Sequence, residues 1–344
     1  MGMMKLEDLV QRQEFTDYFR QQMIEKSTLI QSGIAVPDPT IAAKIAAGSG
    51  LEGKTLDMPS LESLDTADDA EVPVEAQGAT EDKVKPVNDT AVVQFLRKKF
   101  AVTDIAQVMG KTDPMAHIVS QMTPYWQKQD QKRLLAIIDG VFGSNSAKKY
   151  TGSGAESAEN GYKYGGDGDM TLDLTGGTDV LDKDTILLGA QLLGDHKADL
   201  TAIAMNSMVE TILSTKDANA SLYKASEAPG KLATYNGRSI IVDDTIPYNP
   251  ETKVATIYLF GRGVVAYNEL PTKVPFEMDR DKDRAIDFIH SWRRFIMHIR
   301  GMKCNFSPAG LGPTIDELKA VGSWKRIYND VKRIPLVRVK VKLA

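Results

Sequence analysis

Apolar residues recur at helical spacing near the start of the chain. Within residues 5–31 they lie about three or four positions apart, as in an amphipathic helix: Leu6, Leu9, Val10, Phe15, Phe19, Met23 and Ile24. Pro37 and Pro39 end this pattern, because proline cannot continue a helix, and residues 41–47 are mostly small. The pattern predicts a leading helix that packs on its own core or, as an arm, on a neighbouring subunit.

Residues 48–90 contain little that could build a core. They are rich in glycine, proline and acidic residues and include no aromatic residue, a composition that buries too little apolar surface to fold alone. Thr55–Leu61 and residues 71–77 nevertheless have the pattern of two short extended pieces with turn residues between them. This stretch is predicted to be a long acidic β-hairpin that projects from the body and lies on another subunit.

The pattern becomes helical again over residues 104–142. Thr112 and Asp113 can cap a helix that has Pro114 in its first turn, and apolar positions then follow one stripe as far as Val141. This is the longest helix predicted. Pro124 should bend or interrupt it near residue 121, because proline removes a helical hydrogen bond.

The next part of the chain alternates between short elements and loops. Residues 151–177 contain eight glycines among serine, aspartate and asparagine, which predicts an irregular loop. A helix is predicted over 182–193, a strand over Leu200–Met205, and a second helix over 207–215 that is capped by Asn206 or Ser207.

Two short apolar strands and two long charged segments make up residues 235–301. Charge spread evenly along strands suits a sheet whose faces contact other subunits better than it suits an enzyme core. We therefore predict that the charges of 279–284 and 293–300 form contacts between subunits. The end of the chain predicts a half-buried strand with a basic outer face, since valine and leucine alternate with Arg338, Lys340 and Lys342.

Composition limits the class of protein. The 344 residues, 42% hydrophobic and 26% charged, are enough for one large or two ordinary soluble domains. No run of about 18 apolar residues could span a membrane. The first residues lack the apolar core of a secretion signal, and Gly2 lacks the context for myristoylation. Cys304 is the only cysteine, so no internal disulfide can form, which fits a reducing cytosol.

The net charge of −4 is unevenly distributed. Residues 51–90 carry eleven acidic residues against three lysines, and residues 319–344 carry eight basic residues against Asp330. Opposite ends of opposite sign favour contacts between subunits over a nucleic-acid patch. The basic tail strand could touch DNA phosphates without specificity, but it has no interleaved aromatic residue for base stacking.

Residues 48–55 match a phosphate-binding loop. They read Gly-Ser-Gly-Leu-Glu-Gly-Lys-Thr, and residues 239–244 have the pattern of an apolar strand that ends in a magnesium-binding aspartate. The chemistry requires a buried strand before the loop and a helix after it. An alanine-rich segment precedes the loop here, and Pro59 with an acidic stretch follows it. A flexible glycine hinge is therefore the better interpretation.

No other residue pattern indicates catalysis or a metal. The four histidines, His117, His196, His290 and His298, lack metal-ligand spacing and are expected to be structural. Cys304 is expected to be a small buried hydrophobe, and the Asp-Gly-Asp of 167–169 to be a turn. No serine or cysteine nucleophile motif is present. We predict no enzyme activity and no catalytic, cofactor-binding or metal-binding residue.

Taken in order, these pieces resemble the major capsid proteins of tailed bacteriophages. The sequence similarity is concentrated in three segments: residues 202–206 (Ala-Ile-Ala-Met-Asn), 237–247 (Gly-Arg-Ser-Ile-Ile-Val-Asp-Asp-Thr-Ile-Pro) and 258–263 (Tyr-Leu-Phe-Gly-Arg-Gly). The resemblance implies an α+β fold with an N-terminal arm, an extended loop, a peripheral domain with a long spine helix, and an axial domain.

That resemblance also implies the domain boundaries. The arm would be 1–47, the extended loop 48–97, the peripheral domain 98–150 with 265–304, and the axial domain 151–264, while 305–344 would join either domain. The long strands of 273–301 would run beside the spine helix.

The implied function is that of a structural protein without a substrate. Its copies would form hexamers and pentamers of an icosahedral head that encloses double-stranded DNA, assembled in the host bacterial cytoplasm. Scaffolding and portal proteins, and in some cases a decoration protein, would be partners. No cross-linking is predicted for Lys54, Lys83 or Lys85, because no partner asparagine or catalytic glutamate is identified. The alternatives are a nanocompartment shell protein of the same fold and a phosphate-loop ATPase.

Overall fold

The structure is a computed structural model of the chain. It describes residues 34–48, 53–61, 86–104, 114–145, 163–164, 169–175, 181–216, 222–223, 234–328 and 330–343. The helix predicted over 5–31 and the extended piece predicted over 71–77 lie outside these ranges.

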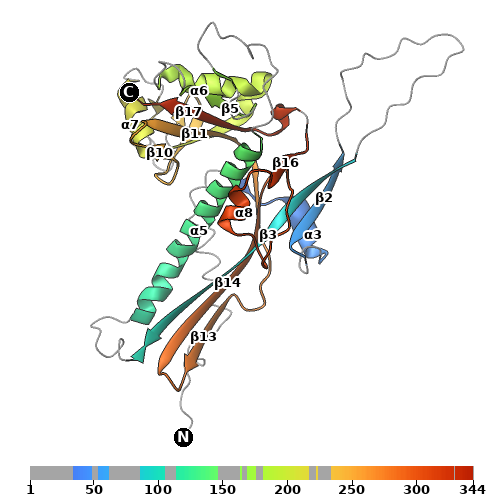
Figure 1. Cartoon of the computed structure of the whole chain (residues 1–344), viewed down its shortest axis with the longest axis vertical. Helices are drawn as coiled ribbons and strands as arrows, with labels where there is room; N and C mark the ends of the chain where they lie inside the picture. Colours follow the sequence, from blue (N-terminus) through green and yellow to red (C-terminus); the bar gives the residue numbers. More distant parts are fainter. Residues whose placement is uncertain are drawn as a thin grey trace, which may run out of the picture.

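A long helix, α5 (Pro114–Ser144), joins two β-sheets. In Figure 1 it runs diagonally, with one sheet beside its lower half and the other at its upper end. The first sheet has the strand order β1-β12-β14-β3-β2, with β13 paired to β14. Its strands are β1 (Ala35–Val36), β2 (Thr55–Leu61), β3 (Pro86–Thr103), β12 (Val265–Glu269), β13 (Phe276–Asp281) and β14 (Ile286–Ile299).

The two longest strands, β3 and β14, form the body of the first sheet. They pair antiparallel from Val93↔Ile296 to Thr103↔Ile286. The strands β13 and β14 confirm the prediction of two long charged segments beside the long helix. The sequence did not predict β3, because its Arg-Lys-Lys run at 97–99 interrupts the apolar pattern.

The sequence predicted a bend or an interruption at Pro124, and the interruption is wrong, because helix α5 continues through this residue. Met122 and Trp126, on either side of the proline, are both buried against the first sheet. Trp126 Nε1 also donates a hydrogen bond of 3.0 Å to Ser291 Oγ on β14. Packing on both sides of Pro124 therefore holds the helix in place despite the missing backbone donor.

A short helix, α3 (Pro39–Ala46), stands where the sequence predicted only a run of small residues. Its first position is Pro39, whose fixed φ suits a helix start. The side chain of Asp38 caps it by accepting a hydrogen bond of 2.8 Å from Thr40 N. The proline that ends one helical pattern thus begins another.

The second sheet has the order β4-β5-β17-β11-β6-β9-β8-β7, with β10 paired to β11. Its strands are β4 (Lys163–Tyr164), β5 (Thr171–Asp173), β6 (Leu200–Met205), β7 (Leu222–Tyr223), β8 (Thr234–Tyr235), β9 (Arg238–Val242), β10 (Tyr248–Asn249), β11 (Val254–Gly261) and β17 (Leu336–Lys342). Buried side chains of α6 (Lys183–Ala190), η3 (Gln191–Asp199) and α7 (Ser207–Lys216) pack against this sheet.

Several predictions are confirmed in the second sheet. The strand β6 has the predicted bounds. Helix α7 is capped by Asn206, whose Oδ1 accepts a hydrogen bond of 3.0 Å from Met208 N. Strand β17 is half-buried, with Val339 inside and Lys342 exposed. The loop predicted over 151–177 is interrupted by β5, which pairs parallel to β17.

The end of the chain first lies beside α5 and then enters the second sheet. Strands β15 (Met302–Cys304) and β16 (Trp324–Arg326) form a small sheet of their own, and with α8 (Ile315–Lys319) they lie beside α5, whose Ile137 and Val141 share a core with Leu318 and Trp324. After η5 (Val331–Arg333), the chain enters the second sheet as β17, between β5 and β11.

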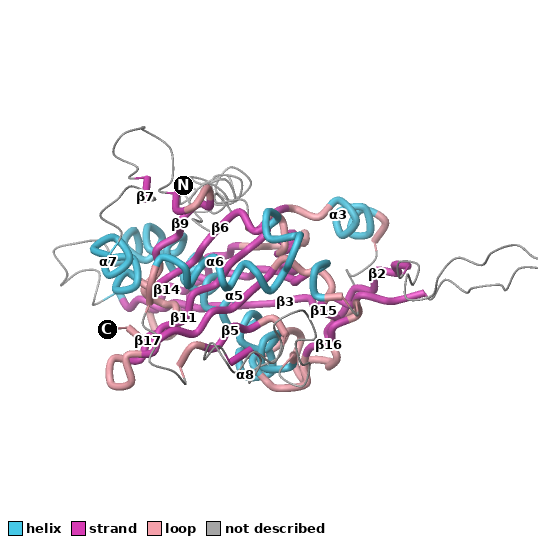
Figure 2. The backbone as a smooth tube through the Cα atoms, turned by 90° about the horizontal axis from the view of Figure 1, so that it is seen from above, coloured by secondary structure: helices cyan, strands magenta, loops and turns pink. Residues whose placement is uncertain are grey.

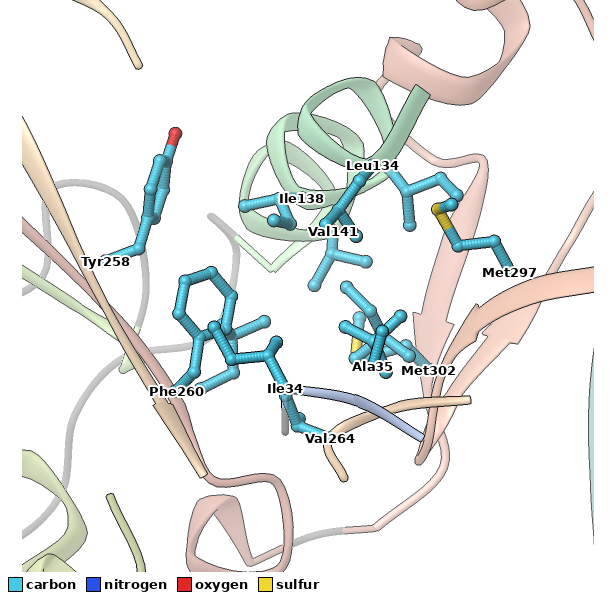
Figure 3. Packing of buried hydrophobic residues seen from close by; sticks show 14 of the residues in the cluster. Ile34, Ala35, Leu134, Ile138, Val141, Tyr258, Phe260, Val264, Met297 and Met302 are labelled. Carbon is cyan, nitrogen blue, oxygen red and sulfur yellow. The ribbon is translucent and has the colours of Figure 1, made fainter. Parts of the chain in front are cut away.

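One core connects the long helix with both sheets. Ile138 and Val141 of α5 lie within it. Tyr258 and Phe260 of β11 face them from one side, and Met297 of β14 lies on the other (Figure 3). Helix α5 is therefore the element through which the two sheets are held relative to each other.

Candidate assembly surfaces

The hairpin of β2 and β3 extends away from the body of the molecule. The two strands pair antiparallel from Thr55↔Val92 to Leu61↔Pro86. Leu56 and Met58 are buried near its base, in a core with Ile41 of α3, whereas Leu61 is 66% exposed. Figure 2 shows β2 and the adjoining end of β3 at the margin of the molecule. The extended piece predicted over Thr55–Leu61 is confirmed, but its partner is β3, whereas the piece predicted over 71–77 lies outside the described residues.

The base of this hairpin is fastened to β14 by a buried acid. Asp89 of β3 lies with its Oδ1 3.0 Å from His298 Nε2, and its Oδ2 accepts a hydrogen bond of 3.1 Å from Gly301 N. His298 is fully buried. This confirms the expectation that His298 is structural, and it fixes the point at which the hairpin leaves the sheet.

A charged cluster lies between α5 and the first sheet. Arg293 of β14 donates to Asp130 Oδ2 of α5 at 2.7 Å and to Glu269 Oε1 of β12 at 2.9 Å, and it also bonds the hydroxyl of Tyr267. Burial raises the pKa of Asp130 to about 6, although Arg293 opposes the rise. Burial acts to lower the pKa of Arg293, but Tyr267 and the two acids together raise it above its ordinary value.

The prediction of an intersubunit contact is wrong for Arg293. Its side chain is 8% exposed, and its charge is neutralised within the subunit. Odd-numbered residues of β14 from Ile289 to Phe295 are buried, so an arginine at 293 must find partners inside. The sequence did contain a signal for this cluster. Arg293 falls at an inward position of its strand, and Asp130 lies in the predicted long helix, so the two could have been expected to pair.

The two halves of the phosphate-loop pattern do not come together. The pattern is preceded by helix α3 and followed by strand β2, which reverses the order that phosphate binding requires. Lys54 Nζ donates to the carbonyl of Pro308 at 2.8 Å. Asp243 lies after β9 and accepts a hydrogen bond of 2.9 Å from Thr245 N. The rejection of a nucleotide site is therefore supported by the described neighbours of the loop.

Two further candidate residues have structural partners. Asp169, the last residue of the Asp-Gly-Asp sequence, forms an ion pair of 2.8 Å with Arg326 and accepts from Asn145. Cys304 is buried, as predicted, and its thiol lies 3.3 Å from the carbonyl of Phe306. Among the described residues, no group of three or more His, Cys, Asp and Glu side chains could hold a metal ion. No described helix is long and apolar enough to cross a membrane.

The sequence is similar to those of known proteins. Residues 79–337 match the model of the Gp13-like family, described as major capsid protein 13-like. The chain belongs to this family of major capsid proteins. It is also 30% identical over 348 residues to the major capsid protein of Bacillus phage SPP1, covering 100% of this chain and 99% of that protein.

Solved capsid structures share the fold of this capsid protein. The capsid of Ralstonia phage GP4 aligns with a TM-score of 0.58 at 11% identity, covering 93% of this chain and 92% of that one. The capsid of cyanophage Pam1 aligns with a TM-score of 0.50 at 13% identity, covering 85% and 86%. The α+β tailed-phage capsid fold predicted from the sequence is confirmed.

The family decides among the three functions considered. The protein is a structural subunit of a tailed-phage head and part of the virion capsid, a homo-oligomeric shell. In such heads the subunits form hexamers and pentamers around double-stranded DNA. The nanocompartment and ATPase interpretations are set aside in favour of the capsid.

Proposed function

We propose that each subunit holds the head together through contacts that are spread over several neighbours. In this proposal, residues 1–47 form an arm, 48–97 an extended loop, 98–150 with 265–304 a peripheral domain, and 151–264 an axial domain. The C-terminal segment contributes to both domains, a division supported by α8 beside α5 and by β17 within the second sheet.

The observation that carries the proposal is the projecting hairpin. Toward Leu61, strand β2 has only β3 as its sheet partner within the described chain, and its apolar end is exposed. An exposed strand edge with an apolar end is costly for an isolated protein, because it invites pairing with other chains. In a shell, a neighbouring subunit would cover it. Many such modest contacts give a closed shell high avidity without one tight pair.

Replacing residues 62–85 with a Gly/Ser segment of the same length tests this role. We expect the variant to keep the unfolding temperature of the unaltered chain, because β2, β3 and the Asp89 clamp are retained. It should yield at least tenfold fewer closed shells by negative-stain electron microscopy. Ordinary numbers of shells would show that residues 62–85 are dispensable for assembly.

The partners of assembly are part of the same proposal. A separate scaffolding protein, a portal protein and, in some heads, a decoration protein would meet this subunit in the host cytoplasm, and packaged DNA would touch the inner surface without sequence specificity. Purified shells from infected cells should contain these proteins and a phage-length double-stranded DNA. Shells filled with an enzyme cargo instead would favour a nanocompartment.

A further inference from the structure

The first sheet carries three parallel stripes on the face opposite α5. Helix α5 packs on the other face, against Leu96 and Phe100 of β3 and Ile289 of β14. Side chains alternate between the faces of a strand, so the neighbouring positions form the opposite face. An acidic stripe lies on β13, an aromatic row on β14 and a basic stripe on β3. Their residues are Glu277 and Asp279, then Phe288, His290 and Trp292, and finally Arg97 and Lys99.

The register places these stripes side by side. Glu277 is opposite His290, which is opposite Lys99. Asp279 is opposite Phe288, and Arg97 is opposite Trp292. The acidic and basic stripes are therefore two strand spacings apart, roughly 10 Å.

The charges of both stripes are exposed and form no ion pair with the residues that the structure describes. Glu277, Asp279, Arg97 and Lys99 all lie in the exposed class. In the part of the chain that the structure describes, none of these four side chains forms an ion pair. At physiological ionic strength, screening acts over about 8 Å, so the two stripes also neutralise each other weakly across the sheet.

The aromatic row holds the basic stripe in place. Lys99 Nζ lies 3.5 Å from the centre of the Phe288 ring, and Arg97 Cζ lies 5.8 Å from the centre of the Trp292 ring. Such contacts restrict two side chains that would otherwise lose rotamer freedom on binding. The basic stripe is thus prepared for a partner that carries negative charge.

Both stripes lie on strands that can accept a neighbour. Strand β13 pairs only with β14 among the described strands. On β3, Val93 N donates to Lys54 O at the side of β2, and over 94–102 only β14 pairs with β3 in the described chain. The sheet therefore ends in an acidic strand on one side and in a basic strand on the other.

We propose that the acidic stripe of one subunit docks beside the basic stripe of the next. This inference rests on the proposed function and names a contact within the shell. The occupant is a second copy of this chain, because one sheet carries both halves of a complementary pair and neither half forms an ion pair within the described part of the subunit. The contact is heterologous, so repeating it passes from copy to copy in one direction, which suits a ring or a lattice.

Charge reversal of each stripe, separately and together, tests the contact. One variant carries Glu277→Lys with Asp279→Lys, a second carries Arg97→Glu with Lys99→Glu, and a third carries all four changes. The first two place like charges against each other at every contact, and we expect at least tenfold fewer shells by sedimentation and electron microscopy. The third restores opposite charges with the sides exchanged, and it should recover most of the shells.

Matched controls keep the charges and change the side chains. Arg97→Lys with Lys99→Arg, and Glu277→Asp with Asp279→Glu, should assemble like the unaltered chain. All variants are compared by thermal unfolding of dissociated subunits. If a two-residue variant does not fold, recovery in the four-residue variant still tests the contact, because folding defects at separate exposed sites would add.

The outcomes separate this contact from the proposed function. Loss in both two-residue variants with recovery in the third supports it. Normal assembly of either two-residue variant, or no recovery in a folded third variant, overturns the proposed contact. In that case, shells formed by the unaltered chain would still uphold the proposed function. If the basic-stripe variant forms normal shells that retain less DNA, the basic stripe contacts nucleic acid and the proposal is wrong. If the unaltered chain forms no shells, the proposed function itself fails.

Discussion

Arg293 connects three elements through a single side chain. Its guanidinium reaches Asp130 on α5 and Glu269 on β12 from its own place on β14. Buried ion pairs add little stability over an apolar replacement of both partners, but removing one partner leaves an uncompensated buried charge. The cluster therefore sets where the long helix lies on the sheet more than it adds to overall stability.

Replacing Arg293 with Met should destabilise the dissociated subunit by about 3 kcal/mol or more, because Asp130 and Glu269 lose their partner. Chemical denaturation at neutral pH measures this. Arg284→Met is the matched control, since Arg284 is 77% exposed and pairs with Asp281, whose side chain is 30% exposed. It should cost about 1 kcal/mol or less. Equal losses in the two variants would contradict a special role for the buried arginine.

The stability of the subunit should depend on the protonation of Asp130. Its folded-state pKa of about 6 lies above the ordinary value of 3.8, so the folded chain binds the proton more tightly. The resulting stabilisation is complete below about pH 4 and is lost as the pH rises through about 6. Relative to Asp130→Asn, the advantage of the unaltered chain should fall by roughly 3 kcal/mol across that window. A constant difference would show that Arg293 keeps Asp130 ionised.

Periodicity in the sequence located the elements that have one covered face. Helix α5 shows a helical pattern and strand β17 an alternating one, and both were predicted. The same method missed β3 and β5. Strand β3 passes from a stretch buried on both faces to a charged exposed one, and β5 has only three residues within a glycine-rich region. Neither has a period to detect.

The crossing of α5 and α8 depends on a glycine that no pattern marked. A Cβ added at Gly140 would lie 2.0 Å from the carbonyl oxygen of Leu318 and 2.7 Å from Trp324 Nε1. Those two atoms are themselves joined by a hydrogen bond of 2.9 Å. The two helices can approach this closely only if position 140 has no side chain.

Gly140→Ala should therefore destabilise the subunit by about 2 kcal/mol or more, because backbone must move and the Trp324 bond is disturbed. Gly143→Ala is the control in the same helix, where the added Cβ meets only Val321 at 3.5 Å. That change should be neutral or slightly stabilising, since alanine favours a helix over glycine. Thermal unfolding of both variants measures the difference. A Gly140→Ala variant as stable as the control would contradict the close crossing.

At the scale of the whole molecule, the sequence could not reveal which distant segments share a sheet. Several elements between 181 and 261 were predicted one by one, but nothing local assigned β17 a position between β5 and β11. It pairs Arg338 with Thr171 on one side and Tyr258 with Arg338 on the other. The resemblance to capsid proteins gave the order of the regions and left residues 305–344 unassigned. Pairing over such separations depends on tertiary packing, which no local pattern encodes.

The central place of β17 means that the second sheet cannot form until the chain is complete. A chain that ends at Ile334 would lose four fully buried side chains, Leu336, Val337, Val339 and Val341. At about 1.5–3 kcal/mol each, this loss is comparable with the whole stability of an ordinary domain. It also leaves β5 and β11 without their shared partner.

We expect the shortened chain to aggregate and to show no cooperative unfolding by circular dichroism. The chain with residues 62–85 replaced serves as the comparison, because it changes more residues but leaves both sheets intact, and it should unfold cooperatively. A shortened chain that unfolds near the temperature of the unaltered one would show that the second sheet forms without its C-terminal strand.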